Sequence, residues 1–320
     1  MKKILSILSL LTFLLVTLGT SLAISSADPQ MEELVAKIQE NLKSGKLSEA
    51  EAFAQKAVQY TQTKHGENDA KTMHAKILLA NIYRDMGKFV EAEALLKGCL
   101  TANEKAYGPE DSSLIEPLAS IGMLMQAQNK LSEAEPAFRR ALAIDLKKPA
   151  TDRLPVAEAK ESLALLRAGE GDLSEAAQLI EQALQEREKA SGSNSEEYAT
   201  TLNNLASIYA QQEKYDEAIV LQEKAIRVLK EASGLDNLTN ALFSQNLAGF
   251  FLLAGKKTEA EKALANVPAL LEKHLGADHP ALAEVLFELA ELNEQMGNAA
   301  KAKELQKKAT EIQTNAEKKQ

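Results

Sequence analysis

Residues 201–218 read TLNNLASIYAQQEKYDEA and contain two apolar stripes of helical spacing. In the first stripe, Leu202, Leu205 and Tyr209 recur at intervals of three and four residues, as on one face of an α-helix. A polar turn follows at Glu213, and a second stripe of the same spacing begins after it. This stretch therefore predicts two antiparallel helices, each with one apolar face to bury.

The same pattern returns every 42 residues. A turn residue, most often glycine, is followed five residues later by alanine in every copy. The turn residues are Gly45, Gly87, Asn129, Gly171, Glu213, Gly255 and Gly297, and the alanines are Ala50, Ala92, Ala134, Ala176, Ala218, Ala260 and Ala302. A unit that cannot bury its apolar face alone must stack on its neighbours, so this period predicts an all-α solenoid of about seven helix pairs.

Other columns describe the helices of each unit. Small residues seven positions before the turn would let paired helices approach closely, and they are Ala80, Gly122, Ala164, Ala206, Ala248 and Ala290. Each second helix is expected to begin at a residue whose side chain caps it, namely Ser48, Ser132, Ser174, Asp216 or Thr258. Pro268 falls midway through the second helix of the sixth unit, where it should kink or end that helix.

These residues resemble the tetratricopeptide repeat family, and within it the 42-residue repeats typified by kinesin light chains. The resemblance is carried by TLNNLASIY at residues 201–209, YDEA at 215–218 and LGADHP at 275–280. It covers roughly residues 30–316. It implies a right-handed superhelix whose first helices line a concave groove that binds a protein or peptide partner, without a cofactor.

Two other helical architectures have similar periods. HEAT and armadillo arrays repeat at nearly this length, but the turn glycine followed by glutamate and alanine fits them poorly. A long coiled coil could also show a period of six heptads. The glycine and proline turns in successive units would interrupt such a coil, so the tetratricopeptide arrangement is favoured over both.

Composition and charge exclude several classes of protein and of partner. Hydrophobic residues make up 45% and charged residues 26%, with 15 Gly and 8 Pro, which excludes a disordered or collagen-like chain. A net charge of −9 argues against nucleic acid as a partner, because phosphates require clustered Lys and Arg. The single cysteine, Cys99, excludes an intramolecular disulfide framework, and its place in an alanine column predicts a small buried core residue.

The first 27 residues have the layout of a secretory signal peptide. Two lysines precede an apolar run over residues 4–18, and small residues continue to Ala27. Cleavage is expected after Ala27, with Ala23 as the alternative. We therefore expect a periplasmic or secreted protein. An anchor retained through residues 4–24 is the alternative, because that run is long enough to span a membrane, and only then would the protein contact a membrane.

The remaining sequence leaves no room for a separate catalytic domain. The repeat array is expected to occupy residues 28–316, followed by a polar tail at 317–320. No Gly-x-Ser-x-Gly, P-loop or Gly-x-Gly-x-x-Gly motif occurs, and the four histidines form no i, i+4 ligand pair. We expect no catalytic residue, no metal site and no enzymatic activity; a hydrolase with an unrecognised site is the remote alternative.

The resemblance also points to residues of the concave groove. Asn203, Asn204 and Asn246 match asparagines that kinesin light chains direct at a bound peptide backbone. An amide side chain suits this role because it can donate a hydrogen bond to the backbone and accept one from it. The full set of candidates is Asn81, Asn203, Asn204, Gln245, Asn246, Leu252, Leu253, Glu284, Phe287 and Glu291. Acidic and apolar residues dominate this groove, so an extended segment with basic and apolar residues is the expected partner.

The sequence therefore predicts an exported, non-enzymatic protein–protein interaction scaffold. Apolar anchors such as Leu252, Leu253 and Phe287 would supply binding energy, and the acids would steer the partner. A structural or assembly component of an envelope complex, or a self-associating array, is the alternative. The partner's identity and the oligomeric state stay open at this point.

Overall fold

The computed structural model describes residues 28–147 and 153–318. The predicted signal peptide and the last two residues of the predicted tail lie outside these ranges. Within them every regular element is a helix, which confirms the all-α prediction. The described residues divide into two compact units, residues 28–190 and 191–318, and each is considered by itself.

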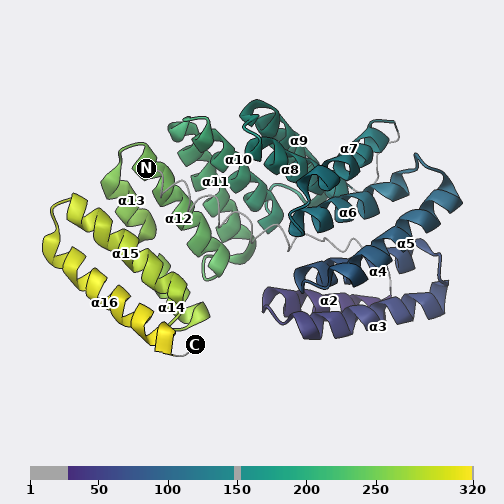
Figure 1. Cartoon of the computed structure of the whole chain (residues 1–320), viewed down its shortest axis with the longest axis horizontal. Helices are drawn as coiled ribbons and strands as arrows, with labels where there is room; N and C mark the ends of the chain where they lie inside the picture. The colour runs from purple at the N-terminus through teal and green to yellow at the C-terminus, as the bar shows by residue number, and fades with distance from the viewer. Residues whose placement is uncertain (1–27, 148–152, 319–320) are drawn as a thin grey trace. The chain divides into compact units, whose positions relative to one another are not determined.

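The first unit consists of four helix pairs. They are α2 (Pro29–Lys43) with α3 (Leu47–His65), α4 (Ala70–Asp85) with α5 (Phe89–Tyr107), α6 (Ile115–Ala127) with α7 (Leu131–Lys147), and α8 (Leu154–Gly169) with α9 (Leu173–Ser191). A short 3-10 helix, η2 (Ser112–Leu114), precedes α6. The first helices α4, α6 and α8 contact one another in turn, and Figure 1 shows the pairs following one another as antiparallel hairpins.

The second unit consists of three pairs. They are α10 (Glu196–Gln211) with α11 (Tyr215–Ser233), α12 (Leu238–Leu253) with the two short helices α13 (Lys257–Leu264) and α14 (Val267–Leu275), and α15 (Pro280–Gln295) with α16 (Ala299–Lys318). The described residues thus contain the seven helix pairs that the 42-residue period predicts. Helix α16 continues to Lys318, two residues beyond the predicted end of the array.

The seven predicted turns have one conformation. At each turn residue φ is positive, as at Gly171, where it is 88°. The next amide reaches back to close the first helix: Asp172 N–H donates to the Arg167 carbonyl at 2.9 Å, the geometry of a Schellman cap. Asn129 and Glu213 take the same left-handed conformation with φ of 58° and 63°, although neither is glycine.

The predicted caps of the second helices are wrong. Ser48, Ser132, Ser174, Asp216 and Thr258 are each the second residue inside their helix. The turn reverses the chain within two residues, so an apolar or aromatic residue such as Leu47 or Tyr215 already begins the helix. Where the N-cap is a lysine, as before α3, α11 and α13, its side chain makes no capping hydrogen bond.

The alanine columns form the contact between paired helices. Six of the seven alanines that follow the turns have no exposed surface, and Ala302 is 3% exposed. The absence of a longer side chain lets the two helix backbones approach closely. Cys99, in another small column, is 1% exposed, which confirms its predicted place in the core.

The second helix of the sixth unit is interrupted, as Pro268 predicts. Helix α13 ends at Leu264, and α14 begins at Val267 with Pro268 as its second residue. Proline cannot donate a backbone hydrogen bond and its ring collides with the preceding turn, so it is favoured in the first turn of a helix. Pro136 lies inside the continuous helix α7, whereas at Pro268 the helix ends and a new one begins with the proline as its second residue.

Candidate functional site

Two of the predicted amide residues lie where α10, α11 and α12 meet. Asn246 Nδ2 donates to Asn203 Oδ1 at 2.8 Å, and Gln222 Nε2 of α11 donates to the same oxygen at 2.9 Å. Gln222 Nε2 also donates to the Phe243 carbonyl at 2.9 Å. Asn203 and Asn246 are 3% and 5% exposed. In the chain as it stands, these amides join helices of neighbouring repeats.

Gln222 was not among the sequence candidates, although it has no exposed surface. The repeat offers a signal for it: the same column holds Leu96, Phe138 and Ile180 in earlier units. A glutamine in an apolar column needs a polar partner, because a buried amide without one is costly. That partner is Asn203 on α10, the helix paired with α11.

The other two asparagines are also buried. Asn204 is 7% exposed and receives a long contact of 3.5 Å from Asn203. Asn81, in the first unit, is 5% exposed; it donates to Ser120 Oγ at 3.4 Å and accepts from Arg84 Nη1 at 3.3 Å. The contact of these asparagines with a peptide backbone stays a prediction, and in the free chain they bond within the array.

The remaining candidates lie on the first helices of the second unit and are more accessible. Leu252 and Leu253 are half-buried at the end of α12. Gln245 is also half-buried and lies about two turns before Leu252 on the same helix. Phe287 on α15 is 36% exposed, and Glu284 and Glu291 on the same helix are exposed. Gln245 and Phe287 occupy the same repeat position, 42 residues apart, so the two helices present equivalent faces.

A further carboxyl group, that of Glu288, belongs to this face. Residues three, four and seven apart share one side of a helix, which places Glu284, Phe287, Glu288 and Glu291 together on α15. Burial, together with the smaller effect of the charges of Glu284 and Glu291, raises the pKa of Glu288 to about 7. We call Leu252, Leu253, Glu284, Phe287, Glu288 and Glu291 the acidic–apolar surface.

Sequence reasoning missed Glu288, although the spacing of the three glutamates was visible. Its half-buried position is what separates it from its exposed neighbours. Because the group titrates near neutrality, its charge depends on pH in the range where proteins work. Above about pH 7 the surface has three negative charges on one helix face.

In the first unit, one repeat position on α4, α6 and α8 holds a histidine and two glutamates. His74, Glu116 and Glu158 stand 42 residues apart, and His74 Nδ1 lies 2.8 Å from Glu116 Oε1. Burial raises the pKa of Glu158 to about 8, against the opposing effect of Arg187. Arg187 is itself buried and pairs with Glu161 at 3.0 Å. Arg187 and Arg84 therefore form ion pairs with acidic residues of the array itself, namely Glu161 and Asp85.

The repeat profile of the tetratricopeptide family matches residues 71–147, 155–231 and 238–315, which is more than half of the chain. The chain belongs to the tetratricopeptide repeat family. The three successive matches cover the helix pairs from α4 onward, including the acidic–apolar surface, and leave the first pair, α2 with α3, outside them. No curated protein sequence matches the chain.

Solved structures share the fold of this tetratricopeptide repeat protein at low identity. BtubC (BKLC) from P. vanneervenii is 18% identical over 78% of this chain and 92% of its own, with a TM-score of 0.60. A putative kinesin light chain from Podosopora anserina with nearly identical TPR-like repeats is 22% identical over 64% and 97%, with a TM-score of 0.52. A Rap protein complexed with competence and sporulation factor is 16% identical over 90% and 78%, with a TM-score of 0.57.

The remaining features of the tetratricopeptide array that could carry chemistry are the Cys99 thiol and the side chains able to bind a metal ion. Burial raises the pKa of the Cys99 thiol to about 11, so the nucleophilic thiolate is disfavoured. Across the part of the chain that the structure describes, no three His, Cys, Asp or Glu side chains are grouped to hold a metal ion. In the same residues, no helix combines the length and apolar character needed to span a membrane.

Proposed function

We propose that this protein is an exported, non-catalytic scaffold that holds a basic and apolar segment of a partner protein on its acidic–apolar surface. Tetratricopeptide repeats generally serve as interaction scaffolds. The observation that carries the proposal is the combination, on neighbouring first helices, of Phe287 at 36% exposure, two half-buried leucines and three glutamates.

The two parts of this surface would act differently. Burying an aromatic or leucine side chain contributes about 1.5–3 kcal/mol, so the apolar residues would supply most of the affinity. Exposed carboxylates add little affinity in water, but they attract cationic partners and disfavour anionic ones. The Rap protein among the structural neighbours is complexed with competence and sporulation factor, which supports peptide binding as a use of this fold.

Export is proposed from the sequence alone. Residues 1–27 lie outside the described residues, which begin at Asp28. Tyr60 donates to Asp28 at 2.9 Å and Lys64 pairs with it at 2.8 Å, so the described fold is anchored from its first residue. N-terminal sequencing of the protein from the envelope fraction should begin at Asp28; an intact Met1 there would support the retained anchor instead.

A peptide array tests the binding proposal. Peptides that alternate Lys or Arg with Leu or Phe should bind the chain, and twins with Glu in place of the basic residues should not. We expect Phe287→Ala to weaken binding about tenfold or more, because truncating an interface anchor commonly costs over 1 kcal/mol. Val220→Ala is the matched control, since Val220 is 63% exposed on the second helix α11. Equal binding of both twins would refute the proposal.

The affinity should also depend on pH. Below about pH 7 the Glu288 carboxyl is protonated and attracts no cation, while above it the carboxylate is charged. Affinity for a Lys-containing peptide should therefore rise about two- to fivefold from pH 6 to 8, the effect of one ion pair at the protein surface. Glu288→Gln should remove this rise and leave the pH 6 affinity unchanged. Fluorescence anisotropy with a His-free peptide measures it; a rise that persists in Glu288→Gln would contradict this role.

A further inference from the structure

A pocket lies on the second-helix side of the last two repeats, away from the acidic–apolar surface. It has a volume of about 500 Å³, within the range of about 300–1,000 Å³ typical of small-molecule sites. Helices α13, α14, α15 and α16 all contribute to it. Its lining residues are Glu261, Lys262, Ala265, Pro268, Leu286, Leu289, Lys301, Glu304, Leu305 and Lys308.

The repeat register explains why the pocket is open. The position of Pro268 holds a half-buried aliphatic residue in the five earlier units: Val58, Leu100, Leu142, Leu184 and Ile226. The position of Ala265 holds a long side chain in every other unit: Gln55, Lys97, Arg139, Glu181, Glu223 and Lys307. Two shortened side chains therefore lie at the break between α13 and α14, beside the pocket, where the other units have longer ones.

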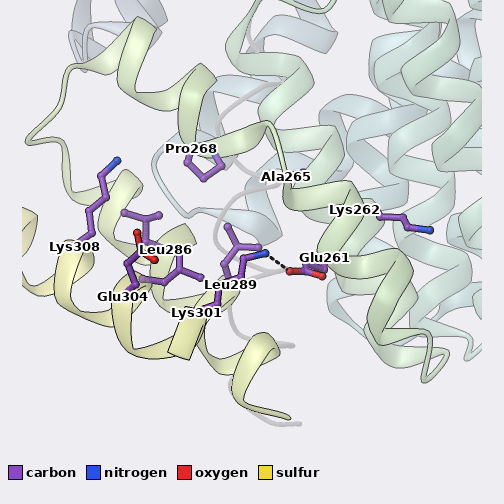
Figure 2. Close-up of a pocket in the computed structure, with 10 residues that line it drawn as sticks. Glu261, Lys262, Ala265, Pro268, Leu286, Leu289, Lys301, Glu304 and Lys308 are labelled. Atoms are coloured by element: carbon purple, nitrogen blue, oxygen red, sulfur yellow. Dashed lines mark hydrogen bonds and ion pairs between the residues drawn. The ribbon is translucent and has the colours of Figure 1, made fainter. Parts of the chain in front are cut away.

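The floor of the pocket is apolar. Leu286 and Leu289 of α15 are 3% and 6% exposed, and Leu305 of α16 packs against the same core cluster. Figure 2 shows the two α15 leucines together with Pro268 of α14 and the side chains of α16. A hydrocarbon chain placed here would meet aliphatic atoms contributed by three helices.

The rim is cationic in an acidic protein. Three lysines and two glutamates line the pocket, a net charge of +1, whereas the whole chain carries −9. Lys301 and Glu261 neutralise each other at 2.5 Å across α16 and α13, drawn as a dashed line in Figure 2. Lys308 reaches Glu272 only at 3.8 Å, and both side chains are about half exposed. Its ammonium can therefore exchange that partner for a ligand's carboxylate at little cost.

We propose that this pocket binds an amphiphilic carboxylate of the fatty-acid class, with its alkyl chain against the leucines and its carboxylate at the lysine rim. The apolar floor favours the chain, and the positive rim selects an anion over a cation of the same length. This site is separate from the acidic–apolar surface, so either proposal can fail alone.

Titration calorimetry of the full chain with dodecanoate, below its micelle concentration, tests the proposal. We expect saturable binding at one site. Dodecyltrimethylammonium, which has the same chain and the opposite charge, should bind at least about tenfold more weakly. Undetectable binding of dodecanoate, or equal binding of the two amphiphiles, would overturn the proposal.

Variants locate the site. Pro268→Ile restores the aliphatic residue of the column, and Ala265→Gln restores a long side chain at an exposed position that tolerates one in Gln55. Each should abolish dodecanoate binding, and the second covers the case in which the first alters folding. Unchanged dodecanoate binding in a folded Ala265→Gln chain would refute the pocket.

Lysine variants test the rim. Lys262→Gln combined with Lys308→Gln should weaken dodecanoate binding about fourfold or more, at about twofold for each exposed charge. Lys257→Gln is the matched control, since Lys257 is an exposed lysine on α13 outside the pocket lining. An equal loss in the control would show general charge attraction and would contradict a specific rim.

Discussion

Gly122 and Phe138 show how one repeat position depends on its partner. Gly122 stands in a column otherwise filled by alanine, and a Cβ atom at this position would lie 2.4 Å from Cε1 of Phe138. Phe138 stands in a column where the preceding unit has Leu96, opposite Ala80. The larger ring and the missing methyl group are therefore compensating changes within one helix pair.

The pair gives a prediction for stability. Gly122→Ala should lower the free energy of unfolding by about 1–3 kcal/mol, because the ring must shift within a packed core. Adding Phe138→Leu should recover part of that loss, since the double variant reproduces the Ala80–Leu96 combination. Urea denaturation followed by circular dichroism measures all four proteins of the cycle. Strictly additive effects would show that the two residues are not coupled.

At the scale of the element, the turn is the feature that fixes each hairpin. Its residue must adopt positive φ, which costs a non-glycine residue about 1–2 kcal/mol. Glycine fills five of the seven turns, and Glu213 ends α10 in the same conformation at φ 63°. The 42-residue period continues through Glu213, so the fold tolerates this strain when the neighbouring helices are well packed.

Glu213→Gly should therefore stabilise the chain by about 1 kcal/mol by removing that strain. The matched control is Glu223→Gly at an exposed position in the body of α11, which should destabilise by about 1 kcal/mol because glycine is a poor helix former. The midpoint of urea unfolding should move in opposite directions for the two variants. A loss of stability in Glu213→Gly would contradict the strain argument.

At the scale of the whole molecule, the period predicted the seven helix pairs and the position of each turn. Periodicity reports which residues must be buried, and an uninterrupted repeat transfers that information from the clearest unit to the least clear one, such as α2. The break at Pro268 was also predictable, because proline acts on its own helix. These features depend on local sequence alone.

Side-chain contacts between helices could not be predicted in the same way. The bonds of Gln222 to Asn203 and Phe243, and the burial of Asn203 and Asn246, depend on how helices stack. The caps were misplaced because the two-residue turn brings an apolar side chain to the helix start. The pocket beside Pro268 needed both a helix break and two shortened side chains, which only the three-dimensional packing brings together.

We propose that the first helices of the second unit hold a basic and apolar peptide. Hydrogen exchange of the full chain, with and without a saturating Lys/Leu peptide, tests it directly. We expect slower exchange in α12 and α15, where Leu252, Leu253 and Phe287 lie, and unchanged exchange in α11 and α16. Protection confined to the second helices, or no protection in α12 and α15 at saturation, would contradict it.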